Sequence, residues 1–385
     1  TNFSYFLAET YYAGKLVPKN VLVVDEAHNC DMELSKFIEI AVTERFAKQA
    51  LKLQMPEIKT QVQAYKWVKE VYEPKLSNHL KHVEKMMEKY VDLKDKIKEF
   101  SNVARKYELL DKHGCKLRRF LKIYNKENWI VNIVPPDGRS GIRLEFKPID
   151  VSSYTEEMLF KHGSKILMMS ATILDKDAFC ELLGIKKSET AFISIPSPFP
   201  VENKPILFSP VGRMNASSID STLPVLAKAI KEILKEHSKE KGIIHCHSYK
   251  IANYLKRNIR SSRILIHDSS NREETLNYHM TSPHPTVLLS PSMTEGIDLK
   301  DDAGRFQVLC KVPYPYLGDK LIKKKMHKWK WWYPLQTAKS IVQATGRSVR
   351  NINDHAVTYI LDEDWNRFYS RNKGLFPEDF KKCLH

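Results

Sequence analysis

The sequence contains no G-x-x-x-x-G-K-[ST] motif, the glycine-rich loop with which many ATP- and GTP-hydrolysing proteins hold phosphates. The nearest candidate is Ala13-Gly14-Lys15-Leu16, which has no second glycine at the required spacing and no hydroxyl residue after the lysine. A phosphate loop of this type is therefore absent from these 385 residues.

Paired cysteines and long apolar runs are also lacking. The six cysteines are scattered and form no C-x-x-C pair, which argues against a zinc ribbon and against the four ligands of an iron–sulfur cluster in this chain. Their arrangement fits a reduced, intracellular compartment. No run of about 18 apolar residues and no signal peptide occur, so we expect no membrane span. The chain begins at Thr1 rather than Met, which suggests a fragment or a processed piece.

The charge balance points to an anionic partner. The sequence has 62 lysines and arginines against 46 acidic residues, which gives a formal net charge of +16 and a pI near 9.3. Nucleic acid is the first interpretation and an acidic membrane surface is the second.

A lysine-rich segment with little glycine interrupts the strand-like parts of the chain. From about Glu39 to Lys122 the first glycine is Gly114, and apolar residues recur every three or four positions with one interruption at Lys94. This pattern predicts a long amphipathic helix or an antiparallel pair of helices. We interpret the segment as an insertion that packs on itself, and a docking site for a partner helix is the alternative.

Short apolar runs outside this segment predict buried parallel strands. In the first part, Val21–Val24 and Ile166–Met169 are expected strands of this kind. Two further strands, Trp129–Val134 and Ile142–Phe146, are expected on either side of a turn at 135–138. After a proline-rich linker at 195–200, strands and helices alternate, which is typical of a parallel sheet covered by helices on both faces. We therefore predict an α/β fold, with a first domain at 1–38 and 126–195, a helical insertion at 39–125 and a second domain at 196–385.

Two carboxylates, Asp25 and Glu26, follow the first apolar run, at the strand end where open α/β sheets bind ligands. One carboxylate can hold Mg²⁺ through water, and the next can accept a proton from an attacking water. An acidic helix cap is the alternative. Ser170 and Thr172 follow another apolar run, and taken alone they indicate a helix N-cap.

Gln343, Arg347 and Arg350 form a more specific group. The two arginines are three residues apart, so on a helix they would share a face. Two guanidiniums and an amide on one face suit the oxygens of a transferring phosphate, whereas a solvated basic face is the alternative. The stretch at 294–298 is a weaker signal, in which Gly296 permits close approach to a phosphate and Asp298 suits a ribose hydroxyl.

Basic and aromatic residues are mixed between Lys323 and Tyr333, where Lys330 and Trp331 are candidates for contacts with phosphates and bases. The alternative is a helix whose tryptophans pack inside while its lysines face water. The stretch His245-Cys246-His247 invites comparison with a metal site. No fourth ligand follows at zinc spacing, so we do not expect a metal there.

The order of these motifs resembles that of the XPD/DinG group of superfamily 2 DNA helicases. The corresponding segments are Val23-Val24-Asp25-Glu26-Ala27-His28-Asn29 for motif II, Ser170-Ala171-Thr172 for motif III, His247-Ser248-Tyr249 for the end of the motif IV strand, 293–299 for motif V and 343–350 for motif VI. Connectors at 2–7, 197–200 and 311–315 also match. The lysine-rich helical segment lies where the family has a helical arch beside a DNA channel.

The resemblance implies two RecA-like domains, the first incomplete, that bind ATP and Mg²⁺ and move 5′→3′ along single-stranded DNA. It implies that Asp25 holds Mg²⁺, that Glu26 is the general base, and that His28, Ser170 and Thr172 couple hydrolysis to domain motion. The residues implied at the nucleotide are Asp298, Gln343, Gly346, Arg347 and Arg350. Those implied near the DNA backbone are Ser248, Tyr249, Thr294 and Gly296.

The family's phosphate loop and the four cysteines of its iron–sulfur domain precede the point where this chain starts. Our leading hypothesis is the motor and DNA-gripping portion of an ATP-dependent DNA helicase, which is inactive without an N-terminal segment where an iron–sulfur cluster would lie. One alternative is a non-catalytic DNA-binding or regulatory module derived from such a helicase. Another is a DEAH-type RNA helicase, against which the helical insertion and the linker at 197–200 argue.

Overall fold

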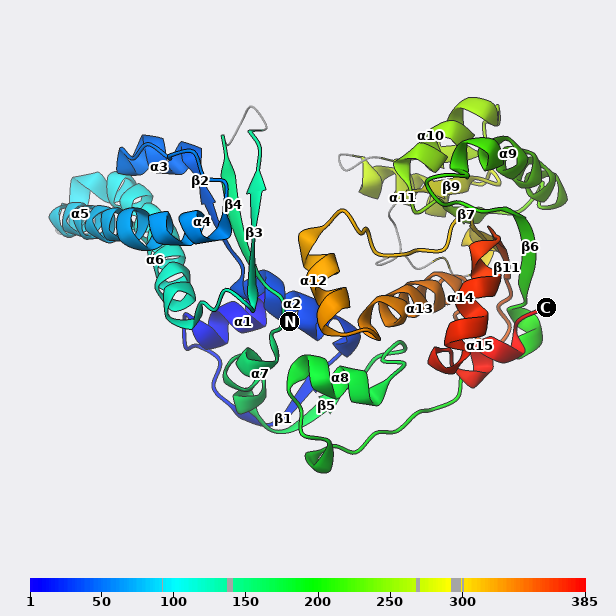
Figure 1. Ribbon diagram of the computed structural model, residues 1–385, viewed down its shortest axis with the longest axis horizontal. Coiled ribbons are helices and arrows are strands. Elements are labelled where there is room, and N and C mark those ends of the chain that lie inside the picture. The colour runs from blue at the N-terminus through cyan, green and yellow to red at the C-terminus, as the bar shows by residue number, and fades with distance from the viewer. Residues whose placement is uncertain (92, 137–140, 268–270, 292–298, 300) are drawn as a thin grey trace. The chain divides into compact units, whose positions relative to one another are not determined.

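The structure is a computed structural model that describes residues 1–91, 93–136, 141–267, 271–291, 299 and 301–385. The chain divides into two units, each assembled from several stretches of sequence (Figure 1). Unit 1 contains Thr1–Ala171, Asp177–Thr190 and Leu317–Lys328. Unit 2 contains Thr172–Lys176, Ala191–Tyr316 and Trp329–His385.

Unit 1 has two small sheets among its described residues. The strands β1 (Lys19–Val24) and β5 (Gly163–Met168) pair in parallel. A second, antiparallel sheet has the order β2-β4-β3, and its strands are β2 (Ile40–Thr43), β3 (Trp129–Val134) and β4 (Arg143–Pro148).

Helices surround both sheets of unit 1. They are α1 (Phe3–Tyr11), α2 (Cys30–Ile38), α3 (Glu44–Leu51), α4 (Gln61–Trp67), α5 (Glu73–Val91), α6 (Ile97–Ile123), α7 (Ser152–Met158), α8 (Lys176–Leu183) and α12 (Lys320–Lys328). Short 3₁₀ turns are η1 (Ala27–Asn29), η3 (Lys94–Lys96), η4 (Phe160–His162) and η5 (Lys187–Glu189). A π turn, η2 (Val68–Tyr72), joins α4 to α5.

The lysine-rich segment forms the expected pair of helices, α5 and α6, which lie side by side in Figure 1. Apolar residues at helical spacing face the partner helix and the core, and Leu76, Val83, Leu110 and Leu117 are among the buried ones. Helix α5 ends at Val91 and α6 begins at Ile97, on either side of Lys94, where the apolar rhythm is interrupted. The prediction of a helical pair is therefore confirmed.

The strand pair β1–β5 is buried on one face only. Val24 lies in the core of unit 1, where Leu22, Ile166 and Met168 also pack. Since side chains alternate along a strand, the intervening residues point the other way. Val21, Val23, Leu167 and Met169 are 55%, 53%, 51% and 42% exposed.

Unit 2 is built on a parallel six-stranded sheet of the order β6-β11-β10-β7-β9-β8. Its strands are β6 (Ile206–Gly212), β7 (Gly242–His245), β8 (Ile264–Ile266), β9 (Val287–Ser290), β10 (Phe306–Leu309) and β11 (Val357–Asp362). Its helices are α9 (Ile219–Glu236), α10 (Tyr249–Asn258), α11 (Arg272–Thr281), α13 (Trp332–Thr345), α14 (Asp364–Asn372) and α15 (Glu378–Lys382), with 3₁₀ turns η6 (Val201–Asn203), η7 (Asp301–Ala303) and η8 (Lys373–Leu375).

The central strands of unit 2 are covered on both faces. Every residue of β7, β9 and β10 is buried. One core lies between the sheet and α9 and α10, and a second lies between the sheet and α13, α14 and α15. The predicted α/β fold with parallel sheets is therefore confirmed.

Helix α12 packs in unit 1 although the sequence on both sides of it belongs to unit 2. Lys325 on α12 is 4% exposed, and its Nζ lies 3.2 Å from Oδ2 of Asp31 on α2, which is 5% exposed. Lys328 donates to Asp150. Two ion pairs thus fix α12 to unit 1. No helix among the described residues is both long and apolar enough for a membrane span.

Candidate functional site

The carboxylates that follow β1 are accessible at the end of the strand. Asp25 and Glu26 are both exposed, and Oδ1 of Asp25 accepts a hydrogen bond of 2.8 Å from the Glu26 amide. Glu26 has φ +49°, a left-handed conformation that non-glycine residues rarely adopt. Such residues cluster at functional sites, and here the sharp turn ends the strand with both carboxylates in solvent.

The turn after β1 is tied to the end of β5. The Ala27 amide donates to the Met169 carbonyl at 2.9 Å. Nδ1 of His28 lies 2.7 Å from Oγ of Ser170 and 3.2 Å from Oε2 of Glu26, and the histidine is 6% exposed. The structure therefore brings together the acidic turn and the Ser-Ala-Thr segment that sequence analysis grouped by motif order.

Thr172, two residues after Ser170, belongs to unit 2. Nε2 of Gln343 on α13 donates to Oγ1 of Thr172 at 3.3 Å, and Thr172 is 3% exposed. The boundary between the units falls between Ala171 and Thr172. The two hydroxyls of one short segment thus contact different predicted motifs, His28 in unit 1 and Gln343 in unit 2.

Arg347 and Arg350 do not lie on a helix, contrary to the geometry that we expected. Helix α13 ends at Thr345, and its cap is Gly346. Buried side chains of Ser348 and Val349 then hold the chain in a non-helical course, while Arg350 is exposed. The prediction that Arg347 and Arg350 share one face of a helix was therefore wrong, because α13 ends before the first of the two arginines.

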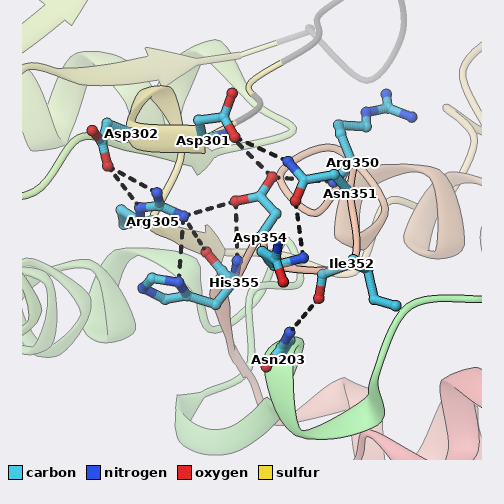
Figure 2. A network of polar contacts seen from close by, with 10 residues as sticks. Asn203, Asp301, Asp302, Arg305, Arg350, Asn351, Ile352, Asp354 and His355 are labelled. Carbon is cyan, nitrogen blue, oxygen red and sulfur yellow. Dashed lines mark hydrogen bonds and ion pairs between the residues drawn. The ribbon is translucent and has the colours of Figure 1, made fainter.

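A buried carboxylate, Asp354, organises this segment (Figure 2). It is 2% exposed and accepts four hydrogen bonds. The amides of Asp301 and Arg350 each donate to Oδ2 at 3.1 Å, whereas Arg305 Nη1 at 2.7 Å and the His355 amide at 3.0 Å donate to Oδ1. Burial alone would raise the pKa of Asp354, but these donors hold that pKa below its usual range.

The Asp354 network joins two predicted motifs. Asn351 Nδ2 donates to Oδ1 of Asp301 at 3.0 Å, and the Leu299 amide donates to the Arg347 carbonyl at 3.3 Å. The end of the motif V segment is thereby fixed to the end of the motif VI segment (Figure 2). Sequence analysis missed Asp354, although the cluster of Asn and Asp residues at 351–354 is a turn signal.

The predicted DNA contacts are only partly within the described residues. Ser248 and Tyr249 begin α10 directly after β7, and Tyr249 is 63% exposed. Thr294, Gly296 and Asp298 lie outside the described residues.

The tryptophans at 329–332 fit partly the nucleic-acid interpretation and partly the alternative, in which they pack inside the protein. Trp329 and Trp332 are 5% and 4% exposed, so they pack within the protein. Lys330 is exposed and Trp331 is partly exposed, with its ring centroid 5.9 Å from that of Trp329. Lys330 and Trp331 therefore retain the accessibility that a nucleic-acid contact needs.

Metal-binding groups are sparse in the part of the chain that the structure describes, where no group of three or more His, Cys, Asp or Glu side chains is arranged to hold a metal ion. His245 and His247 lie with parallel rings 6.0 Å apart, and burial together with Lys311 lowers the pKa of His247 to about 4. A single accessible carboxylate such as Asp25 nevertheless fits Mg²⁺, which proteins bind through one or two carboxylates, with phosphates and water as the other ligands.

Comparisons with known proteins show similarity to helicases. Residues 230–383 match a family of helicase C-terminal domains. The ATP-dependent DNA helicase YoaA of Haemophilus influenzae is 25% identical over 218 residues, which are 54% of this chain and 32% of that protein. The ATP-dependent DNA helicase XPD of Sulfolobus acidocaldarius is 22% identical over an alignment of 418 positions, which takes in 100% of this chain and 71% of that protein.

Solved structures agree on the fold. A structure titled "XPD_APO" has a TM-score of 0.59 at 19% identity and covers 97% of this chain and 79% of its own. The structure of Xpd4 from S. tokodaii has a TM-score of 0.57 at 17% identity and covers 99% of this chain and 80% of its own. The chain spans about a third of the length of YoaA, so it corresponds to part of such proteins. Over residues 230–383 the chain matches helicase C-terminal domains, and it is similar to XPD/DinG-like superfamily 2 helicases over more of its length.

Proposed function

We propose that this chain is the motor and DNA-gripping portion of an ATP-dependent DNA helicase that translocates 5′→3′ on single-stranded DNA. The observation that carries the proposal is the contact between His28 and Ser170, at 2.7 Å, beside the exposed Asp25 and Glu26. His28 contacts both the Glu26 carboxylate and the Ser170 hydroxyl. A change at a bound nucleotide could therefore pass from Glu26 through His28 to the Ser-Ala-Thr segment.

Each acidic residue has a separate role in the proposed reaction. Glu26 accepts the proton of the attacking water, and its exposed carboxylate has room for that water. Asp25 holds Mg²⁺ through water, and when bound this ion neutralises charge on the phosphates. The backbone amide of Glu26 donates a hydrogen bond of 2.8 Å to Oδ1 of Asp25, and this bond orients the Asp25 carboxylate.

The two arginines of unit 2 have a separate role in the proposed reaction. Arg347 and Arg350 follow α13, and Gln343, three residues before Gly346, donates to Thr172. We infer that the guanidiniums of Arg347 and Arg350 meet the γ-phosphate, with Asp298 at the nucleotide. Hydrolysis would then release this contact, and repeated cycles of ATP turnover would drive movement along DNA.

The exposed face of β1–β5 supports a partner segment that carries the phosphate loop. Val21, Val23 and Leu167 are more than half exposed on that face, although parallel strands in α/β domains are normally covered on both sides. We infer that an N-terminal helicase segment, with an iron–sulfur cluster in the family's usual place, covers this face and supplies the missing phosphate contacts. None of the six cysteines, all of which lie in the described part of the chain, is in a disulfide, which agrees with an intracellular setting.

One observation favours a second function, a non-catalytic DNA-binding or regulatory module: the sequence has no phosphate loop. A DEAH-type RNA helicase is a third candidate, which the helical pair α5–α6 after motif II argues against. The accessible catalytic carboxylates favour the enzyme, because a module without chemistry has no need of them.

Steady-state ATP turnover separates these functions. We expect negligible turnover by the chain alone, and turnover stimulated by single-stranded DNA when a segment with the phosphate loop is added. Glu26→Gln should abolish that turnover, while Glu33→Gln on α2 serves as the matched control. DNA-stimulated turnover by the chain alone, or turnover that survives Glu26→Gln, would contradict the proposal, and greater stimulation by RNA than by DNA would favour the RNA helicase.

A further inference from the structure

The residues that follow the proline-rich linker at 195–200 are bonded to the turn after Arg350. Nδ2 of Asn203 donates to the Ile352 carbonyl at 3.1 Å (Figure 2). The Asn203 carbonyl accepts a hydrogen bond of 2.9 Å from the Ala356 amide. We call Asn203, Ile352 and Ala356 the linker clamp. None of the three belongs to the helicase motifs that the sequence analysis used, and the side-chain bond joins residues 149 positions apart in the sequence.

On one side of the linker clamp, the turn at 350–356 is closed on itself. The Arg350 amide donates to Oδ2 of Asp354 at 3.1 Å. The Asp354 amide donates to the Asn351 carbonyl at 3.2 Å. Ile352 lies between these bonded residues, so a displacement of the Arg350 backbone moves the Ile352 carbonyl as well.

On the other side of the linker clamp, residues 197–204 form one stiff stretch, which we call the linker piece. Nζ of Lys204 donates to Oγ of Ser197 at 2.9 Å and so ties the two ends of the piece together. Pro198 and Pro200, which lie between them, each fix one backbone dihedral. The Ser197 amide also donates to Oδ2 of Asp379 on α15, which gives the piece a defined resting position. A displacement that reaches the clamp is therefore passed along the whole piece.

The side-chain bond of the linker clamp suits a contact that forms and breaks. Asn203 is only partly buried and Ile352 is 61% exposed, so water can replace the bond at both ends. Such an exchange with water leaves a hydrogen bond with a small net free energy. The backbone bonds from Ala356 to Asn203 and from Thr358 to Pro205, each 2.9 Å long, instead continue the pairing of β6 with β11. A change of the Asn203 side chain therefore opens the clamp and leaves the sheet intact.

We propose that Asn203 is a positioning residue that passes a displacement of the turn at 350–356 to the linker piece during ATP turnover. The inference rests on the proposed function, because it takes Arg350 to meet the γ-phosphate. When that contact is released, the turn shifts, Ile352 draws Asn203 with it, and the linker piece moves as one body. Asn203 thereby links hydrolysis to movement without itself contacting the nucleotide.

Hydrogen exchange in the full chain without nucleotide tests the link, because it reports local opening. Asn351→Ala removes the 3.0 Å bond from Asn351 to Asp301 and loosens the turn. It should speed exchange of the linker piece several-fold, and Asn203→Asp, whose carboxylate cannot donate a hydrogen bond, should cancel that increase. Asn258→Asp on α10 is the matched control, since Asn258 also donates to a backbone carbonyl, at 2.8 Å, but lies outside the clamp. No increase in the parent, or an increase that persists with Asn203→Asp, would overturn the proposal.

DNA unwinding per ATP hydrolysed is the second measurement. In the protein supplied with its phosphate loop, Asn203→Asp should keep DNA-stimulated ATP turnover but lower the number of base pairs unwound per ATP several-fold, whereas Asn258→Asp should leave both like the parent. A merely structural role would lower turnover and unwinding in proportion, and that result, or parent-like unwinding per ATP, would overturn the proposal. Absence of ATP turnover in the parent would overturn the proposed function instead, while the exchange result would still decide the link through Asn203.

Discussion

The parallel strands of the two units have similar sequences but very different surroundings. Val308 in β10 is 0% exposed, whereas Val23 in β1 is 53% exposed. Each belongs to a short apolar run, yet one sheet has helices on both faces and the other has a core on one face only. An apolar run therefore predicts a parallel strand but not the number of layers that cover it. The difference also separates a sheet that is complete in this chain from one that we propose is completed by a further segment.

The largest expected effect is on ATP turnover, which should require residues of unit 2 as well as the carboxylates of unit 1. In the protein supplied with its phosphate loop, Arg350→Ala in unit 2 should lower ATP turnover by about 10³-fold, if its guanidinium stabilises the transition state. Arg350→Lys should restore little, because an ammonium cannot reproduce the planar fork. Turnover at saturating DNA is the measurement, and DNA affinity without nucleotide should stay unchanged. Normal turnover by Arg350→Ala would remove that residue from the site.

A smaller effect is expected on the stability of unit 2. Asp354→Asn should lower its free energy of unfolding by about 3 kcal/mol, because Arg305 loses a buried partner. Asp302→Asn is the matched control, since Asp302 binds the same guanidinium at 2.8 Å but its side chain is 95% exposed. Urea unfolding measures the free energy of unfolding of both variants, and hydrogen exchange of the β11 amides reports on unit 2 in particular. Equal losses would show that burial of Asp354 is unimportant.

The effect of Asp354→Asn on stability should depend on pH. The pKa of Asp354 is lowered in the folded protein, so its carboxylate stabilises the fold fully above its unfolded pKa of about 3.9. That contribution is lost as the pH falls through the folded pKa. The stability difference between the parent and Asp354→Asn should therefore be constant near neutrality and shrink below about pH 4. A difference that grows in acid would contradict this assignment.

Two valines test the contrast between the sheets directly. Val308→Ala should destabilise unit 2 by about 2 kcal/mol, because it leaves a cavity under two covering layers. Val23→Ala in the chain alone should cost much less, since its side chain already meets water. Both can be measured by urea unfolding. If a further segment does cover β1, its addition should make the Val23→Ala variant measurably less stable than the parent complex.

The smallest effect should appear at the link between the acidic turn and the Ser-Ala-Thr segment. Ser170→Ala removes the hydroxyl that lies 2.7 Å from His28 but leaves Asp25 and Glu26 in place. In the protein supplied with its phosphate loop, we expect ATP turnover without DNA to persist in this variant, while the stimulation of turnover by single-stranded DNA falls several-fold. The ratio of turnover with and without DNA measures this coupling. An unchanged ratio would leave the contact with a structural role only.

The parts of the fold that were predictable are those that local apolar patterns determine. The helical pair follows from apolar spacing over many turns, and the buried strands of unit 2 follow from short apolar runs between helices. Strand β6 is hard to predict from its sequence because it contains Pro210. It lies at the sheet edge, where a missing backbone donor is tolerated. Strand β2 has four residues and was absorbed into the helical segment.

The site was predictable in its residue types but less so in its geometry. Motif order grouped His28 with Ser170, and the structure brings their side chains together. The helical face assigned to Arg347 and Arg350 failed, although Gly346 is a usual signal for the end of a helix. The Asp354 network depends on residues brought together from distant parts of the chain, which no local pattern records.

Helix α12 has a consequence for how the protein is made. Asp31 meets its buried partner Lys325 across 294 positions of sequence. At ribosomal rates of about 5–20 residues per second, Asp31 leaves the ribosome roughly 15–60 s before that partner does. Unit 1 therefore begins to form early but gains its last helix only after most of unit 2 has been synthesised. A recombinant fragment that ends at the linker would lack this helix and keep a core carboxylate without its counter-ion.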